Sequence, residues 1–215
     1  MKKLITRKKV DAFWKKRTKI EDARVSTHFR DDDMHVFDLR LINKYITPKT
    51  RLLDLGAGTC YHANRLANKV AYIKATDKFG EFLKYCNVGT NFETEAADAL
   101  TYSDGKKYDV ILLLGILNYF DDDEALQIYK NCKSMLSSDG TLIVKHQSGV
   151  DENVVVDKFS QMIGDNYHAL YRDKKRDEAL LKKYFNVEVI DIYPKRLNPW
   201  PNTHFYAYVC THKTE

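Results

Sequence analysis

A doubly wound α/β fold around one mainly parallel sheet is the fold class that this 215-residue sequence predicts, on three observations. Apolar runs at 51–55 and 108–115 are typical of strands that are covered on both faces. Stretches of helical periodicity separate such runs, as in successive βα units. The last two predicted strands, 186–194 and 204–212, are joined by about ten residues, too few for a crossover helix, so they should be antiparallel neighbours.

The elements follow one another in the order that such a sheet requires. A helix is predicted over 31–46, where apolar residues recur at helical spacing after an acidic start and before Pro48. The further elements before residue 150 are strands at 51–55, 70–77, 92–96, 108–115 and 141–147, and helices at 60–69, near 79–87 and at 123–137. Residues 151–184 are predicted to form a charged helical insertion. The domain organisation is therefore a basic N-terminal arm over 1–33 and one domain over 34–215.

Composition and charge indicate a globular chain with an asymmetric charge distribution. Hydrophobic residues make up 44% and charged residues 30%, which excludes disorder. The net charge of +5 is the sum of +8 over residues 1–30, from 11 Lys/Arg and 3 Asp/Glu, and −3 over residues 31–215. A basic arm of this kind attracts nucleic acid, an anionic lipid surface or a phosphorylated substrate, or else is a solvated helix face.

The cysteines and the N-terminus favour a cytoplasmic chain. No apolar stretch of about 20 residues is present to span a bilayer, and the basic start has no apolar segment of a secretory signal behind it. The four cysteines are scattered and form no CxxC pair, so we expect free thiols and no structural zinc. These cysteines are Cys60, Cys86, Cys132 and Cys210.

The glycine turn after the strand 51–55 raises the question of which ligand it holds. Gly56 and Gly58 lie where ligands bind in such sheets, and they allow close approach of the backbone. A dinucleotide site would have a third glycine at Tyr61, and no GxxxxGK[ST] phosphate loop is present. Asp54 would repel a phosphate and can hold an ammonium group. The turn is therefore predicted to hold a ligand without phosphate.

Two further carboxylates complete the predicted nucleoside site. Asp77 ends the strand 70–77 and can accept hydrogen bonds from both ribose hydroxyls. Asp98 follows the strand 92–96 and is placed to reach an adenine amino group. An acidic nucleoside site of this kind suits S-adenosylmethionine (SAM).

Four segments in order, "LLDLGAGTC", "ATDKF", "AADAL" and "YDVILLLGILNYF", resemble the first four motifs of class I SAM-dependent methyltransferases. They span residues 51–120. The resemblance implies a Rossmann-like, seven-stranded sheet in the order 3-2-1-4-5-7-6, with the last strand antiparallel. Cys60 departs from the third glycine of many members. The cofactor-binding residues that the resemblance implies are Asp54, Gly56, Ala57 and Gly58 at the methionine end, Asp77, Phe79 and Asp98 at the adenosine, and Gly115 and Asn118 under the sulfonium.

The methyl acceptor is predicted from what the sequence lacks. "GILNYF" differs from the motif of adenine amino methyltransferases, no cysteine follows a proline as in pyrimidine C5 methyltransferases, and "KHQSG" lacks the ligands of metal-dependent catechol types. These absences favour O-methylation of a small or carbohydrate acceptor by an enzyme that uses no metal ion. The acceptor can be a free sugar or a phosphorylated or lipid-linked glycan. The segments "FWKKRT", "STHFRDDD" and "DIYP" with "NTHFYAY" are also weakly similar to methyltransferases of bacterial surface-glycan (O-antigen or capsule polysaccharide) biosynthesis.

A base near neutral pKa is expected to take the acceptor proton. His146 ends the strand 141–147 and is the first candidate, followed by His204 and by His28 in the arm. In related folds an N-terminal segment covers the cofactor, so Arg17 is a candidate clamp for the SAM carboxylate. The candidate acceptor-binding residues are Tyr119, Gln147, Tyr171, Arg172 and Asn202. Two alternatives stay open: an RNA methyltransferase that uses the basic arm, and a non-catalytic SAM-fold subunit of a partner enzyme.

Overall fold

A computed structural model of the chain describes residues 6–27, 34–161 and 163–213. One seven-stranded sheet dominates it, with the strand order β3-β2-β1-β4-β5-β9-β8. All neighbours pair in parallel except β9, which is antiparallel to both β5 and β8. The predicted fold class and strand order are therefore confirmed. The strands of this sheet are β1 (Arg51–Leu55), β2 (Tyr72–Asp77), β3 (Phe92–Ala96), β4 (Tyr108–Leu114), β5 (Leu136–Gly149), β8 (Phe185–Asp191) and β9 (Thr203–His212).

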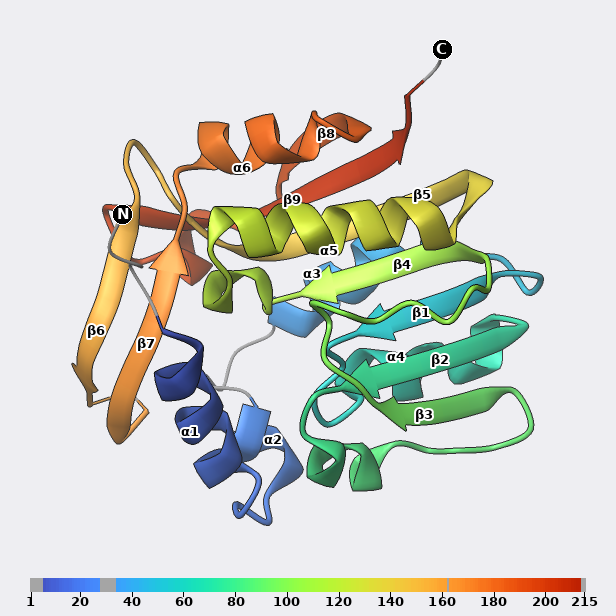
Figure 1. The fold of residues 1–215 in the computed structure, drawn as a ribbon, viewed down its shortest axis with the longest axis horizontal. Helices are drawn as coiled ribbons and strands as arrows, with labels where there is room; N and C mark the ends of the chain where they lie inside the picture. The colour runs from blue at the N-terminus through green and yellow to red at the C-terminus, as the bar shows by residue number, and fades with distance from the viewer. Residues whose placement is uncertain (1–5, 28–33, 162, 214–215) are drawn as a thin grey trace.

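Helices cover both faces of this sheet, as the two-sided burial of its central strands requires (Figure 1). On one face, α5 (Asp122–Met135) and α6 (Lys174–Leu181) contribute to a core cluster with side chains of β4 and β5. On the other face, α3 (Met34–Ile42) and α4 (Tyr61–Leu66) pack on β1, β2 and β4. A capping box fixes the start of α5, because the Asp121 side chain accepts a hydrogen bond from the Glu124 backbone. Short 3₁₀ turns, η1 (Ala67–Lys69), η2 (Gly80–Tyr85), η3 (Leu117–Tyr119) and η4 (Lys195–Leu197), occupy the connections.

Two helices and a hairpin lie beyond the carboxyl ends of the parallel strands (Figure 1). The helices are α1 (Arg7–Arg17) and α2 (Ala23–Thr27), and the hairpin consists of β6 (Val154–Ser160) and β7 (Asp165–Tyr171). The prediction of a purely helical insertion over 151–184 is therefore wrong, and α6 is the only helix among the described residues of that range. The first four side chains of β6 alternate between half-buried and exposed, which is the pattern of a strand with one face toward the protein.

The cysteine prediction needs a correction. Cys60 and Cys86 form a disulfide with Cα atoms 5.1 Å apart, a separation that suits such a bond. These two cysteines are 26 residues apart in sequence, and they meet only because the glycine turn and η2 lie side by side in the fold. Cys132 and Cys210 are free and buried. Among the described helices, none is both long and apolar enough to cross a membrane.

Candidate active site

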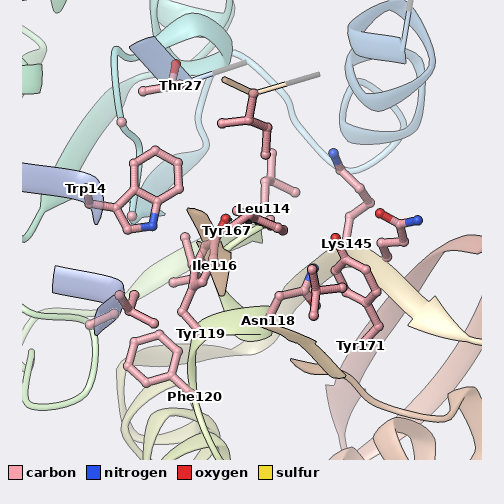
Figure 2. Close-up of a pocket in the computed structure, with 18 of the residues that line it drawn as sticks. Trp14, Thr27, Leu114, Ile116, Asn118, Tyr119, Phe120, Lys145, Tyr167 and Tyr171 are labelled. Carbon is pink, nitrogen blue, oxygen red and sulfur yellow. Dashed lines mark hydrogen bonds between the residues drawn. The ribbon is translucent and has the colours of Figure 1, made fainter. Parts of the chain in front are cut away.

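A cavity of about 770 Å³ lies between the carboxyl ends of the parallel strands and the layer of α1, α2 and the β6–β7 hairpin. In the view of Figure 2, Trp14 and Thr27 lie on one side of this cavity, and Lys145 and Tyr171 lie on the other. The position agrees with the rule that ligands of doubly wound sheets bind at the carboxyl ends of strands.

The glycine turn brings bare backbone to the cavity wall. Gly56 and Gly58 have φ angles of 82° and 54°, a region that favours glycine. The backbone N–H groups of Gly56 and Ala57 each donate to the Thr76 carbonyl at 2.8 Å, which ties the turn to β2. A Cβ on Gly56 would lie 2.5 Å from Cγ2 of Ile116, so the opposite wall is already in contact with the turn.

Asp77 organises the segment between the glycine turn and η2. Its carboxylate accepts hydrogen bonds from the backbone N–H of Gly58 at 2.9 Å and of Phe79 at 2.8 Å. Burial raises the pKa of Asp77 to about 6, although the two hydrogen bonds from the backbone lower it. Burial, and to a smaller extent the negative charge of Asp77, raises the pKa of Asp54 to about 7. Hydroxyl donors or a cationic group bound here would stabilise the two ionised carboxylates. The electrostatics of this wall therefore fit a ligand with hydroxyls and a positive charge.

The candidate cofactor residues from β1, β2, β3 and β4 meet in this cavity. Those that line it are Asp54, Gly56, Ala57, Gly58, Asp77, Phe79, Asp98, Gly115 and Asn118. Asp98 forms ion pairs with Arg7 of α1 and with Lys78, at 3.3 Å in the second case. Arg17 is the exception and is a correction. Its guanidinium donates to the backbone carbonyls of Ser26 and Val25, so it ties α1 to α2 and is not among the described residues that line the cavity.

Two of the predicted bases lie away from the cavity, which is a second correction. Successive side chains of a strand point to opposite faces, and on β5 it is Lys145 and Gln147 that line the cavity. His146 points to the other face, where it is fully buried and its Nε2 donates to Asp177 at 2.8 Å. His204 pairs with Ser148 on that same face, and its Nε2 donates to Asp191 at 2.7 Å. His28 lies outside the described residues.

Most of the candidate acceptor-binding residues do line the cavity, namely Tyr119, Gln147, Tyr171 and Asn202. Arg172 is the correction here, because its side chain is fully buried and is not among the described residues that line the cavity. Its Nε donates to Asp122 at 2.7 Å, its Nη1 lies 3.4 Å from Asp177, and it also donates to backbone carbonyls of η3 and of the residue that follows. Arg172 therefore belongs to the buried network that holds His146.

Sequence reasoning missed a polar cluster at the cavity wall opposite α1. His35 of α3, His62 of α4 and Lys145 of β5 line the cavity, and all three surround the buried carboxylate of Asp38. The sequence carried one usable signal, since a histidine and an aspartate three positions apart on α3 share a helix face. Their contact with Lys145 depends on the tertiary fold.

Comparisons with known proteins agree with this arrangement. Residues 52–140 match the model of a methyltransferase domain family. Among solved structures, the chain resembles Haemonchus contortus phosphoethanolamine N-methyltransferase 1 in complex with phosphoethanolamine and S-adenosylhomocysteine (TM-score 0.73, 17% identity, 97% of this chain and 49% of that chain). It also resembles a putative SAM-dependent methyltransferase from Listeria monocytogenes (0.64, 16%, 84% and 100%) and the N-methyltransferase NodS from Bradyrhizobium japonicum WM9 with S-adenosylhomocysteine (0.65, 13%, 92% and 96%). A comparison with curated proteins gives no match.

The methyltransferase domain model that matches residues 52–140 and the class I methyltransferase fold support a SAM-dependent methyltransferase, with SAM as the cofactor. The structural likenesses, all below 25% identity, show the shared fold. The chain spans about half the length of the Haemonchus contortus enzyme and nearly all of NodS. The acceptor is therefore a separate question.

Asp77→Ala is expected to weaken SAM binding by about 1–3 kcal/mol, because it removes the bond to the glycine turn together with the hydrogen bonds that we propose to the ribose. Calorimetric titration with SAM measures this. Asp109→Ala is the matched control, since Asp109 also accepts a hydrogen bond from a backbone N–H, that of Arg51 at 2.9 Å. Asp109 lies near the amino end of β4, away from the carboxyl ends that line the cavity. Equal SAM affinities of the two variants would remove Asp77 from the cofactor site.

Proposed function

We propose that this protein transfers the methyl group of SAM to a hydroxyl oxygen of a small carbohydrate acceptor. The observation that supports this most is the composition of the cavity beyond Gly115 and Asn118. The loop before β9 and β9 itself contribute Trp200, Asn202 and Phe205 to it, and β5 contributes Gln147. Aromatic rings and amides suit the apolar faces and the hydroxyls of a sugar, respectively.

The residues at the strand ends fit SAM in chemistry and position. Gly56 and Gly58 would take the methionine part with bare backbone, and Asp77 would accept the ribose hydroxyls. When bound, SAM supplies a methyl group on a positively charged sulfur. The chain then has to hold the acceptor oxygen in line with that methyl group, exclude water and receive a proton.

The N-terminal arm supports a lid over this site. Val10, Asp11 and Trp14 of α1 line the cavity, and basic side chains of α1 reach acidic groups on the surrounding elements. The pairs are Arg7 with Asp98, Lys9 with Asp157, Lys15 with Glu81 and Lys16 with Asp165. Because these cations are engaged within the protein, they favour closure over the cavity and leave less charge for the phosphates of an RNA. The described part of the arm, residues 6–27, is thus proposed as a lid and not as a nucleic-acid contact.

The test of the proposed function has two stages. In the first, SAM and S-adenosylhomocysteine are titrated calorimetrically, with NAD as the control, and binding of the first two alone is expected. In the second, formation of S-adenosylhomocysteine is followed with methyl glucoside, UDP-N-acetylglucosamine, phosphoethanolamine and a short RNA as acceptors. Methylation of a sugar hydroxyl is expected. Because the Haemonchus contortus relative is an N-methyltransferase, methylation of the amine alone would replace the O-acceptor with an N-acceptor, and methylation of RNA alone would reverse the interpretation of the arm.

A further inference from the structure

The position of methyl transfer limits which groups can receive the acceptor proton. The backbone N–H of Gly115 donates to the carbonyl of Lys145 at 2.6 Å, so the side chain of Lys145 begins next to the expected sulfonium position. Tyr119 and Tyr171 also line this region, but burial raises the pKa of both phenols, so they keep their protons. The carboxylates of Asp54 and Asp77 are assigned to the cofactor under the proposed function, which leaves imidazoles as the suitable proton acceptors. His35 and His62 are the two imidazoles that line the cavity among the described residues.

Asp38 is the centre around which these groups are arranged. Its carboxylate is almost fully buried, and its Oδ2 accepts from His62 Nε2 at 3.2 Å and lies 3.1 Å from Lys145 Nζ. Its Oδ1 accepts from the Tyr193 hydroxyl at 2.5 Å. Burial opposes ionisation of Asp38, but the charge of Lys145 and the hydrogen bonds of His35 and His62 hold its pKa well below the usual range. Asp38 is thus a fixed anion that orients its neighbours.

We propose that His62 is the general base of methyl transfer, with Asp38 as the residue that positions it; this rests on the proposed function. Because Nε2–H of His62 donates to Asp38, the lone pair of the neutral ring is on Nδ1. His62 lines the cavity shortly after the glycine turn, and its side chain is 11% exposed. The centroids of the His62 and Tyr61 rings are 5.5 Å apart. A carboxylate that fixes the tautomer of a histidine is the arrangement that general-base catalysis requires.

The neighbours of His62 keep it available as a base. The groups that face it are Asp38 and His35 from α3, Tyr61 beside it and, through Asp38, Lys145 from β5. Burial lowers the pKa of His35 against the hydrogen bond of Asp38, and the charges of His62 and Lys145 lower it further. The neutral form of His35 is thereby favoured, and the Asp38 carboxylate is the charged group that contacts His62.

A metal ion is the competing interpretation of the same residues. Ligand atoms of His35, Asp38 and His62 lie within 4.8 Å of one another. The ammonium group of Lys145, however, shares Oδ2 of Asp38 with His62, and Tyr193 takes Oδ1. A divalent cation would have to displace a positive charge from its own carboxylate ligand, so the cluster is better suited to moving a proton.

The proposed step balances in atoms and charge. The acceptor oxygen forms a bond to the methyl carbon, and the electrons of the carbon–sulfur bond stay on sulfur, which becomes a neutral thioether. The hydroxyl proton moves to Nδ1 of His62, and the imidazolium is stabilised by Asp38. The proton then leaves to solvent when the products leave.

His62→Gln tests the proposal, because the Gln amide can still donate to Asp38 but cannot accept the proton at neutral pH. We expect turnover to fall by about 10²-fold or more, with SAM affinity little changed. Turnover is measured with whichever of methyl glucoside, UDP-N-acetylglucosamine and phosphoethanolamine the wild type methylates fastest. His168→Asn is the matched control. His168 is likewise paired with an aspartate, since its Nδ1 lies 2.5 Å from Asp157 Oδ1, and its side chain is 14% exposed. His168 is not among the described residues that line the cavity. The turnover of the His168→Asn variant should stay at the wild-type level.

A second measurement needs no acceptor. The histidine ring nitrogens of the wild-type protein with bound S-adenosylhomocysteine are observed by NMR, and His62→Gln assigns the His62 signals. We expect the neutral His62 ring to carry its proton on Nε2, and Asp38→Asn to weaken this tautomer preference because it removes the carboxylate that accepts the proton.

Three results would overturn the proposal. They are a neutral His62 ring with its proton on Nδ1, near wild-type turnover of His62→Gln, and loss of turnover in EDTA that Zn²⁺ restores. Absence of SAM binding, or of methylation of any probe, counts instead against the proposed function. The NMR measurement still decides the tautomer of His62 in that case, with the free protein in place of the complex.

Discussion

Gly56→Ala is expected to lower SAM affinity by about 10²-fold, roughly 2.7 kcal/mol. Two costs add at this position. A side chain at a φ of 82° costs about 1–2 kcal/mol in the left-handed region. The new Cβ would also lie 2.5 Å from Cγ2 and 3.0 Å from Cδ1 of Ile116, which lines the cavity at the end of β4. The glycine turn and that wall must therefore separate, and the cofactor site between them changes shape.

Gly105→Ala is the control for the backbone cost alone. Gly105 has a similar φ of 70°, but a Cβ there would meet nothing within 4 Å. Calorimetric titration of both variants with SAM, together with their thermal unfolding, separates a steric effect at the site from general destabilisation. If Gly56→Ala and Gly105→Ala bind SAM equally well, the close approach of the turn to Ile116 does not control cofactor binding.

Arg172→Met is expected to reduce the free energy of unfolding by about 3–5 kcal/mol, because it leaves the buried carboxylate of Asp177 without its cation. Arg172 and Asp177 are both fully inaccessible, and Asp177 also accepts from His146 and from the Ser148 hydroxyl at 3.1 Å. This network joins β5, α6 and the start of α5. Urea denaturation gives the free energy of unfolding, and calorimetry shows whether the folded fraction still binds SAM.

Arg176→Met supplies the comparison, since Arg176 pairs with the same Asp122 that Arg172 contacts. The Arg176 side chain is 53% exposed, so its loss should cost no more than about 1 kcal/mol. A substrate-binding role of Arg172, as the sequence predicted, would instead give a stable variant with impaired acceptor binding. Equal urea midpoints of the two variants would contradict the structural role.

The residues that the sequence predicted for the cofactor wall line one cavity because they adjoin strand ends. Asp54 is the penultimate residue of β1, Asp77 ends β2 and Asp98 follows β3 by two residues, and parallel strands place those ends at one edge of the sheet. Local pattern is enough to find such positions. The cavity accordingly contains every one of these three residues.

The acceptor side could not be predicted in the same way. β5 is covered on both faces, so its polar end, "KHQS", does not indicate which side chains reach the cavity. Counting from the strand end suggested His146, whereas the alternation of the strand turns Lys145 and Gln147 to the cavity. The charged segment 151–184 likewise contains a hairpin, and its strand β7 contacts α1 and η3, which come from distant parts of the chain.

By itself the sequence determined the succession of strands and helices before residue 150 and the antiparallel end of the sheet, because periodicity and turn chemistry act over a few residues. The order of the strands within the sheet followed from the resemblance to class I methyltransferases. Only the tertiary structure decided which histidine meets the cavity. His62, Asp38 and Lys145 come from three separate elements, and their ion pairs form when α3 and α4 pack against the same face of the sheet. Contacts between residues so far apart in the chain leave no local pattern, since each residue alone has the features of an ordinary helix or strand position.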